Sequence, residues 1–410
     1  MSEPAVLRDE PGLGRSAEQE QFGAALHELL GAADVPGAAR AWAAGDQAPG
    51  QAVWRQLAGL GVTGLAVPER HGGAGASPLD LVVACQELGH HAVPGPVAES
   101  LAAVPTLLAG LSEAAGLSET AGLSETAGLS EAAGLSETAA GPVEPAAQEL
   151  ASRCAGWLTG LAAGELLGTL AVPPRLPYAV DADAAGLVLL VSAGSVWLAR
   201  PGSQHRSVDP TRWLTEAQPA ERLADCAVTA GPAGRAVLLG TLASAAQLLG
   251  AGRALLEASV RHATQRAQFG RPIGAFQAVK HQLADVAIGL EFAQPLLDAA
   301  AVAVAAGGGS ARRDVSAAKV ACADAAYRAA RTALQVHGAI GYTEEHDLSL
   351  WLAKVRALVP AWGSQAEHRA VVLAAVTGGA ERRSGAGGSG GSPPGQQSRG
   401  SSPRASTGGA

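Results

Sequence analysis

The sequence has few aromatic residues and no long run of basic ones. Phe, Trp and Tyr make up 3% of the 410 residues, whereas hydrophobic residues as a class make up 48%. A core this large with so few rings depends on closely packed alanine and glycine, which suits bundles of helices. The net charge is −8, and no basic block is long enough to follow a phosphate backbone, which argues against nucleic acid as the main partner.

Cysteine is scarce, and its spacing excludes two kinds of site. Cys85, Cys154, Cys226 and Cys322 lie far apart, with no CxxC pair and no clustered histidines in the sequence. This pattern predicts neither a zinc site nor a disulfide framework, and hence no metal. Four reduced cysteines are typical of a cytoplasmic protein, which is the location we predict.

Long hydrophobic runs are also missing. The most apolar stretch, residues 237–252, contains Thr241, Ser244 and Gln247 and is too short and too polar for a membrane span. The N-terminus has no basic start followed by an apolar run, so we predict no signal peptide and no membrane association.

The pattern along the chain predicts a mainly α-helical protein in five parts. These are a disordered N-terminus (1–15), an N-terminal helical domain (16–168), a reduced β middle domain (169–235), a C-terminal four-helix bundle (236–377) and a disordered tail (378–410). Predicted N-terminal helices are 17–30, 52–60, 79–91 and 146–164, and predicted bundle helices are 237–267, 276–306, 311–337 and 365–376. Ser77 is expected to cap the third of these helices, with Pro78 in its first position.

Two segments depart from the helical pattern. Residues 110–139 contain five tandem copies of a six-residue unit, GLSEAA or GLSETA. Six is not a multiple of the helical period, and each glycine lowers helix stability by about 1 kcal/mol, which predicts a flexible insertion. Residues 187–191 and 196–199 are short apolar runs, which predict two strands joined by a tight turn at 193–195.

Three quoted segments, taken in order, resemble the acyl-CoA dehydrogenase family. They are GLAVPERHGGAGASPLDLVVACQELG (Gly64–Gly89), RAQFGRPIGAFQAVKHQLADV (Arg266–Val286) and ALQVHGAIGYTEEHDLSLWLAKVRAL (Ala333–Leu358). The resemblance implies the family fold: an N-terminal helical domain, a β-barrel-like middle domain and a C-terminal four-helix bundle. It also implies FAD as cofactor, an acyl-CoA substrate and an oligomer. VPGPVAESL (Val93–Leu101) and TEEHDLSLWL (Thr343–Leu352) are similar to the branch that degrades steroid side chains, in which two different chains pair.

The resemblance also implies a set of residues that contact FAD across a subunit boundary. They are Arg266, Gln268, Phe269, Phe276, Gln277, Gln335, Val336, His337, Gly338, Gly363 and Ser364. Each has a simpler interpretation from the sequence alone. An arginine at a helix end is commonly solvated, the phenylalanines could fill the bundle, the first glutamine of a helix could cap it, and the histidine could be buried with an ordinary partner.

The family's catalytic glutamate is absent at both positions where it usually occurs. Counting along the motifs places these positions at Trp362 and Gly240, and neither side chain can accept a proton. The family's threonine-glutamate-proline loop, which embraces the flavin ring, is not recognisable either. Three interpretations follow: a dehydrogenase subunit whose partner chain supplies the base, a decayed scaffold that binds no FAD, or a retained pocket with altered chemistry.

Overall fold

The computed structural model describes residues 14–115, 144–343 and 346–385. The chain divides into two compact units, Met1–Val372 and Leu373–Ala410. The helices and sheet discussed below belong to the first unit, except for the last part of one helix. Most of the six-residue repeat, as well as Glu344 and Glu345, lies outside the described residues.

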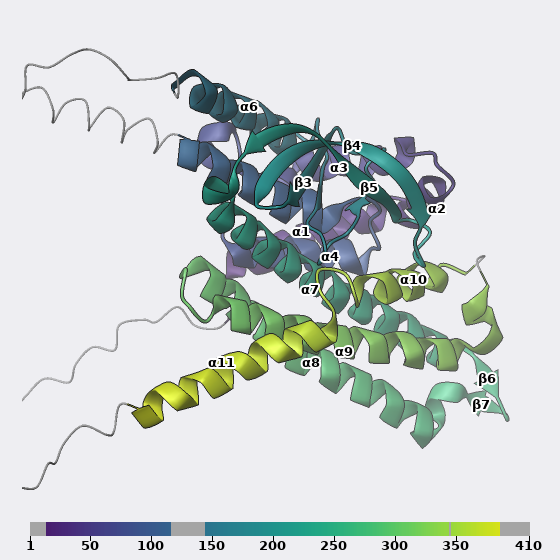
Figure 1. The fold of residues 1–410 in the computed structure, drawn as a ribbon. Helices are drawn as coiled ribbons and strands as arrows, with labels where there is room; N and C mark the ends of the chain where they lie inside the picture. Colours follow the sequence, from purple (N-terminus) through teal and green to yellow (C-terminus); the bar gives the residue numbers. More distant parts are fainter. Residues whose placement is uncertain (1–13, 116–143, 344–345, 386–410) are drawn as a thin grey trace, which may run out of the picture. The chain divides into compact units, whose positions relative to one another are not determined.

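The N-terminal region is helical, as predicted, and contains more helices than the sequence indicated (Figure 1). Its elements are α1 (Ala17–Ala32), α2 (Val35–Ala43), α3 (Ala48–Gly59), the 3-10 turns η1 (Val62–Gly64) and η2 (Glu69–His71), α4 (Pro78–His90), the π-helix η3 (Glu99–Ala103), helical residues 104–115, and α6 (Glu144–Ala162). The short helix α2 was not predicted, because one or two helical turns give too little periodicity to recognise.

The predicted start of α4 is confirmed. Ser77 and Asp80 form a reciprocal capping box: the Ser77 hydroxyl accepts from the Asp80 amide at 3.3 Å, and the Asp80 carboxylate accepts from the Ser77 amide at 2.9 Å. Pro78 occupies the first helical position, where its missing N–H costs nothing.

The middle of the chain forms a five-stranded mixed sheet in the order β1-β3-β4-β5-β2. The strands are β1 (Gly168–Ala171), β2 (Ala179–Val180), β3 (Leu187–Ser192), β4 (Ser195–Arg206) and β5 (Trp213–Ala224). The predicted turn is confirmed at Ala193 and Gly194, whose φ angles of 49° and 74° suit a two-residue hairpin loop. The predicted second strand was too short, because the exposed half of β4 lacks an apolar run and pairs with β5 through its backbone.

The C-terminal bundle is confirmed. Its helices are α7 (Cys226–Gln265), α8 (Gln277–Ala305), α9 (Ala311–His337), α10 (Leu348–Leu358) and α11 (Gln365–Gly385). Between α7 and α8 lie the strands β6 (Ala267–Gln268) and β7 (Arg271–Pro272) and the turn η4 (Ile273–Ala275), and η5 (Gly338–Tyr342) follows α9. The predicted end of the last helix near residue 376 is wrong, since α11 reaches Gly385; the domain boundaries themselves stay predictions.

Small residues bring the backbones of α4 and α7 into direct contact. A Cβ atom added at Gly250 would lie 1.9 Å from the Gln86 carbonyl oxygen, and one at Gly89 would lie 2.2 Å from the Gln247 carbonyl oxygen. The crossing therefore requires glycine on both helices. This close approach is the structural counterpart of the alanine- and glycine-rich composition.

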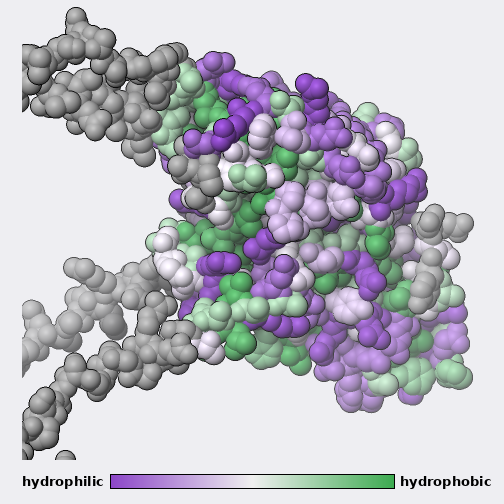
Figure 2. Space-filling view, in the orientation of Figure 1, coloured by the Kyte–Doolittle hydropathy of each residue, from purple (hydrophilic) through white to green (hydrophobic). Residues whose placement is uncertain are grey.

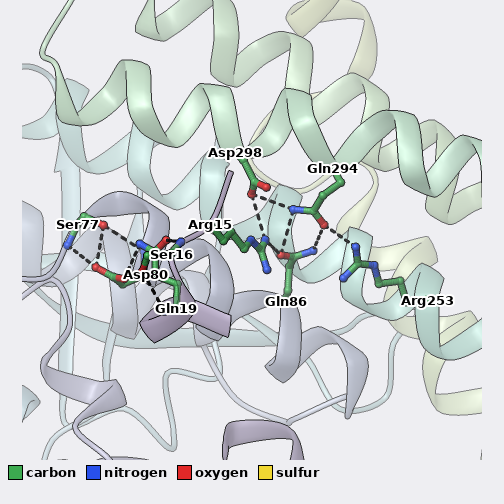
Figure 3. Close-up of polar contacts among 9 residues, drawn as sticks. All are labelled: Arg15, Ser16, Gln19, Ser77, Asp80, Gln86, Arg253, Gln294 and Asp298. Carbon is green, nitrogen blue, oxygen red and sulfur yellow. Dashed lines mark hydrogen bonds and ion pairs between the residues drawn. The ribbon is translucent and has the colours of Figure 1, made fainter. Parts of the chain in front are cut away.

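A polar network joins α4 to the bundle beside this crossing (Figure 3). The Gln86 amide donates to Gln294 Oε1 on α8 at 2.8 Å, and Arg253 on α7 donates to the same oxygen at 2.7 Å. Arg15 donates to Gln86 and to Asp298, the latter at 3.0 Å. Gln86 is nearly fully buried, so these bonds satisfy polar groups that water cannot reach.

The outer face of α8 carries an apolar stripe. Ile288, Phe292 and Leu296 lie on successive turns and are 53%, 72% and 46% exposed. By length and composition α8 is the one described helix that could cross a membrane, yet α7 and α9 pack along it. On the face drawn in Figure 2, hydrophobic residues form separate patches among hydrophilic ones, without a continuous apolar band.

Lys319 is the one lysine that the bundle core buries completely among the described residues. Its ammonium group donates to Ser244 Oγ on α7 at 2.9 Å and to the Leu358 carbonyl on α10 at 2.8 Å. No carboxylate pairs with it there, and burial lowers the pKa of Lys319 to about 7. Its amine thus ties α9 to α7 and α10 by hydrogen bonds.

We predict that Lys319 makes stability depend on pH between about 7 and the usual lysine range. The unfolded chain holds this proton up to about pH 10.4, while the folded chain releases it above about pH 7. Unfolded molecules bind more protons in this window, so the free energy of unfolding rises with pH, by at most about 1.4 kcal/mol per pH unit. Denaturant titrations at several pH values from 7 to 10 measure this rise. The free energy of unfolding should stop rising with pH in Lys319→Met and should still rise in Lys280→Met, which changes an exposed lysine on α8. Equal slopes in wild type and Lys319→Met would contradict the assignment.

Candidate functional site

The two positions where the resemblance predicts a catalytic glutamate, Trp362 and Gly240, lie against each other. Trp362, between α10 and α11, is 1% exposed. A Cβ atom at Gly240 on α7 would lie 2.2 Å from two carbons of the Trp362 ring. The indole therefore occupies the space above Gly240, and only glycine fits beneath it. No carboxylate stands at either position.

Trp362 also touches a buried carboxyl group that the sequence analysis did not single out. The Trp362 side chain interacts with the carboxyl group of Glu99 in the π-helix η3, and Arg212 approaches the same carboxyl at 4.0 Å. Burial raises the pKa of Glu99, and the nearby Arg212 opposes that rise. Short π-helical segments inside α-helices are frequent at functional sites, but the pattern of VPGPVAESL gave no signal for a buried acid.

Two further buried carboxyl groups join the sheet to the helices. Asp181 accepts from the Trp213 amide at 2.9 Å, and burial raises the pKa of Asp181 to about 7. Asp209 accepts from the Thr211 hydroxyl at 2.7 Å and lies 3.5 Å from Lys354 on α10. The second oxygen of each carboxyl group, Oδ2, is buried without a hydrogen-bond partner among the described residues.

A cationic cavity of about 480 Å³ lies beside Trp362. Its polar lining comes from the loop after β1 and from α7, α9 and α11, and consists of Arg175, Thr241, Arg312, Ser316 and His368. Nε of Arg175 is buried and has no hydrogen-bond partner among the described residues. Two guanidinium groups and no carboxylate make this cavity suited to an anion and unsuited to proton abstraction.

Gly363 and Ser364, predicted to contact FAD, lie next to this cavity. Gly363 is buried, and a Cβ atom there would lie 2.8 Å from His368 Nε2 and 3.0 Å from Arg175 Nη2. His368 is held by the Trp362 carbonyl at 3.2 Å and Ser316 Oγ at 3.1 Å, and burial lowers its pKa to about 4. Arg175 and His368 therefore cover the backbone of Gly363.

The predicted residues around the end of α7 are exposed at one end of the bundle. Arg266 follows the last residue of α7, and Arg266, Gln268 and Gln277 are all exposed. Phe269 is 92% exposed, so it does not fill the bundle, and its ring lies 6.2 Å from that of the half-buried Phe276. These side chains form an open surface with both cationic and aromatic groups.

The predicted residues at the end of α9 lie beside the same surface. His262, one turn before Arg266, stacks on His337 with ring centroids 4.3 Å apart. His337 is buried and bonds through Nδ1 to the Ala333 carbonyl at 2.8 Å, which matches its simpler interpretation. Val336 is half-buried. Gln335 and Gly338 line an open groove of about 1010 Å³, whose charged lining consists of Arg328, Arg331, Asp285 and Asp324.

The described residues therefore fit one part of FAD and not the other. The open surface offers arginine, glutamine and exposed glycine backbone, which suit phosphates and a nucleotide. Around Gly363 and Gly240, by contrast, Trp362, Arg175 and His368 fill the space.

Comparison with known proteins identifies the family of both helical regions. Residues 16–115 match the acyl-CoA dehydrogenase N-terminal domain, and residues 221–377 match the acyl-CoA dehydrogenase C-terminal domain. The chain is similar to acyl-CoA dehydrogenase IpdE2 of Mycobacterium tuberculosis, with 30% identity over 322 residues, which cover 78% of this chain and 85% of that protein.

Solved structures share the fold. The ChsE4-ChsE5 complex from Mycobacterium tuberculosis aligns with a TM-score of 0.66 and 21% identity over 89% of this chain and 98% of that one. The FAD complex of PigA aligns with a TM-score of 0.65 and 17% identity over 89% and 98% of the two chains. The predicted fold class, helical domains around a small sheet, is confirmed.

We predict that Gly240 and Trp362 are energetically coupled. Gly240→Ala should cost about 1–3 kcal/mol of stability through overpacking, and Trp362→Ala about 3–5 kcal/mol through the cavity it leaves. The double variant should be more stable than the sum of these losses implies, by about 0.5–3 kcal/mol, because the cavity accepts the new methyl group.

Denaturant unfolding of the four proteins measures this coupling. Gly234→Ala is the matched control on the same helix, since nothing lies within 4 Å of a Cβ atom there. That change should add independently to Trp362→Ala. Strict additivity of Gly240→Ala with Trp362→Ala would show that the indole does not occupy this space.

Proposed function

The chain belongs to the acyl-CoA dehydrogenase family, and we propose that it is the subunit of a heteromeric acyl-CoA dehydrogenase that lends residues to FAD while its partner supplies the catalytic base. The observation that carries this proposal is the contact between Trp362 and Gly240. This contact fills the space at both positions where a catalytic base is predicted, whereas the end of the bundle that is predicted to face FAD is open.

The reaction of the family requires a hydride acceptor and a base. FAD accepts a hydride from the β-carbon of an acyl-CoA thioester, and a carboxylate takes the α-proton. In this chain Glu99 interacts with Trp362, but its carboxyl group is buried and has Arg212 4.0 Å away. A base from another chain is therefore the simplest way to complete the reaction.

The open surface supports the lending role. Arg266 can offer several fixed donors to a phosphate of FAD. Gln277 can donate and accept, and the exposed backbone at Gly338 permits close approach of a ligand. Because Arg266, Gln268, Phe269 and Gln277 are exposed at a bundle end, a neighbouring chain's cofactor can reach them.

Comparison supports the cofactor and the assembly. PigA is described as an FAD complex and ChsE4-ChsE5 as a complex of two chains. The apolar stripe on α8, Ile288, Phe292 and Leu296, offers a surface for a neighbouring subunit. An acyl-CoA substrate follows from the family, and IpdE2 bears the name acyl-CoA dehydrogenase.

The alternative is a scaffold subunit that binds no FAD at all. It is favoured by Arg175 and His368, which cover Gly363 on the side where a flavin ring would rest. The two proposals agree that this chain has no complete active site of its own. They differ in whether the open surface contacts a cofactor.

Co-expression separates the two proposals. We expect the chain purified alone to be colourless, and the complex with a dehydrogenase-like neighbouring chain to show flavin absorbance near one FAD per pair. The complex should reduce an electron-accepting dye when acyl-CoA is added. If no partner restores flavin or turnover, the lending role is wrong; full FAD content and activity in the isolated chain would mean that this chain contains its own base.

Arg266 provides the residue-level test in that complex. We predict that Arg266→Gln weakens FAD retention by about 10- to 100-fold, since it removes a charge-assisted bond of about 1.5–3 kcal/mol. Arg200→Gln, an exposed arginine on β4, is the matched control and should leave retention unchanged. FAD release is followed by fluorescence during dilution, and unchanged release from Arg266→Gln would favour the scaffold alternative.

A further inference from the structure

Three histidines, unrelated to the flavin surface, converge on one point. His27 comes from α1, while His90 ends α4 and His91 follows it. Their ring centroids are separated by 5.0 Å, 4.7 Å and 5.0 Å in a closed triangle. One nitrogen from each ring lies within 4.8 Å of the others. The sequence analysis found no such cluster, because His27 is distant from the other two along the chain.

Two carboxylates border the triangle. Glu87 Oε2 on α4 lies 3.0 Å from His27 Nδ1, and Glu257 Oε2 on α7 lies 3.5 Å from His90 Nε2. His91 Nε2 is also 3.2 Å from His27 Nδ1. A single imidazole nitrogen has one proton or one lone pair, so His27 Nδ1 cannot form a full hydrogen bond with both neighbours. A cation placed among these atoms would be attracted by all of them.

The surroundings allow an ion to enter and to be held. A cavity of about 360 Å³ is lined by the three histidines together with Glu257, Leu255 and Trp351. His27 is half exposed, which leaves a path to solvent, whereas only 14% of the His90 side chain is exposed. The carbonyl of His90 accepts from Trp351 Nε1 at 2.7 Å, which fixes the backbone of the pair.

We propose that His27, His90 and His91 form a zinc site, with Glu87 or Glu257 as a fourth ligand. Zinc takes four nitrogen or oxygen ligands at about 2.0–2.2 Å, which places neighbouring tetrahedral ligands about 3.3 Å apart. The His27 to His91 nitrogen separation of 3.2 Å is already near this value. The remaining nitrogens reach it by rotation of exposed or half-buried rings.

The charges around the site suit a divalent cation with one or two carboxylates. Arg253 and Arg261 lie close enough to act on His90 and oppose a positive ion. Glu87 and Glu257 offset these two charges, and Arg261 is held 3.9 Å from Glu257. His27 lies on α1, His90 and His91 lie at the end of α4, and Glu257 lies on α7. A zinc ion bound by these residues would hold the three helices together.

Metal uptake by the full chain tests this inference independently of flavin or partner. The protein should be produced without a polyhistidine tag, stripped with chelator, and titrated with zinc. We expect one equivalent of zinc per chain and a higher unfolding temperature with zinc. Cobalt should give the intense visible bands of a tetrahedral site.

Variants decide between a zinc site and a metal-free histidine stack. His27→Asn, at a half-exposed position, and His91→Asn should each weaken zinc binding by at least about 100-fold, since each removes a metal ligand. His205→Asn is the matched control, because His205 on β4 is also exposed and pairs with Glu216 at 3.0 Å. No uptake by the wild type, or equal uptake by wild type and His27→Asn, would overturn the proposal.

Discussion

The packing of one indole on one glycine is the contact on which the rest of the candidate site depends. Trp362 fills the space above Gly240, and the motif count predicts a base at each of these two positions. A carboxylate at position 240 would have to displace the indole, and one at position 362 would have to replace it, in a site that is almost fully closed. Removing a buried tryptophan costs about 3–5 kcal/mol, so the side chain that excludes a base also stabilises the core.

The two parts of the predicted site carry different groups. Near Trp362 the cavity walls carry Arg175, Arg312 and His368, which suit an anion and not a base. At the far ends of α7 and α9, side chains suited to a nucleotide are exposed. The gathering of arginine, aromatic and glutamine residues at that end is the feature that the proposal of a shared active site rests on.

The sequence predicted the bundle closely because long helices repeat their pattern many times. It predicted the cap at Ser77 and the turn at Ala193 because those conformations need particular residues. It missed the exposed half of β4, which is specified by pairing with β5 rather than by apolar alternation. Within the site it located Trp362 and Gly240 by counting, but their mutual contact depends on how α7 meets the segment after α10, and no local pattern encodes that distance.

Contacts between distant segments account for the remaining features. One group of interacting residues, Glu99, Arg212 and Trp362, comes from three regions of the chain. None of the three stands in a sequence pattern that predicts a buried charged group. The same is true of His27 and the pair His90 and His91, which only the packing of α1 on α4 brings together. Buried or clustered ionisable groups are costly unless their partners are supplied. The partners found here are a tryptophan and a guanidinium for Glu99 and two carboxylates for the histidines, and each comes from a segment distant in the sequence.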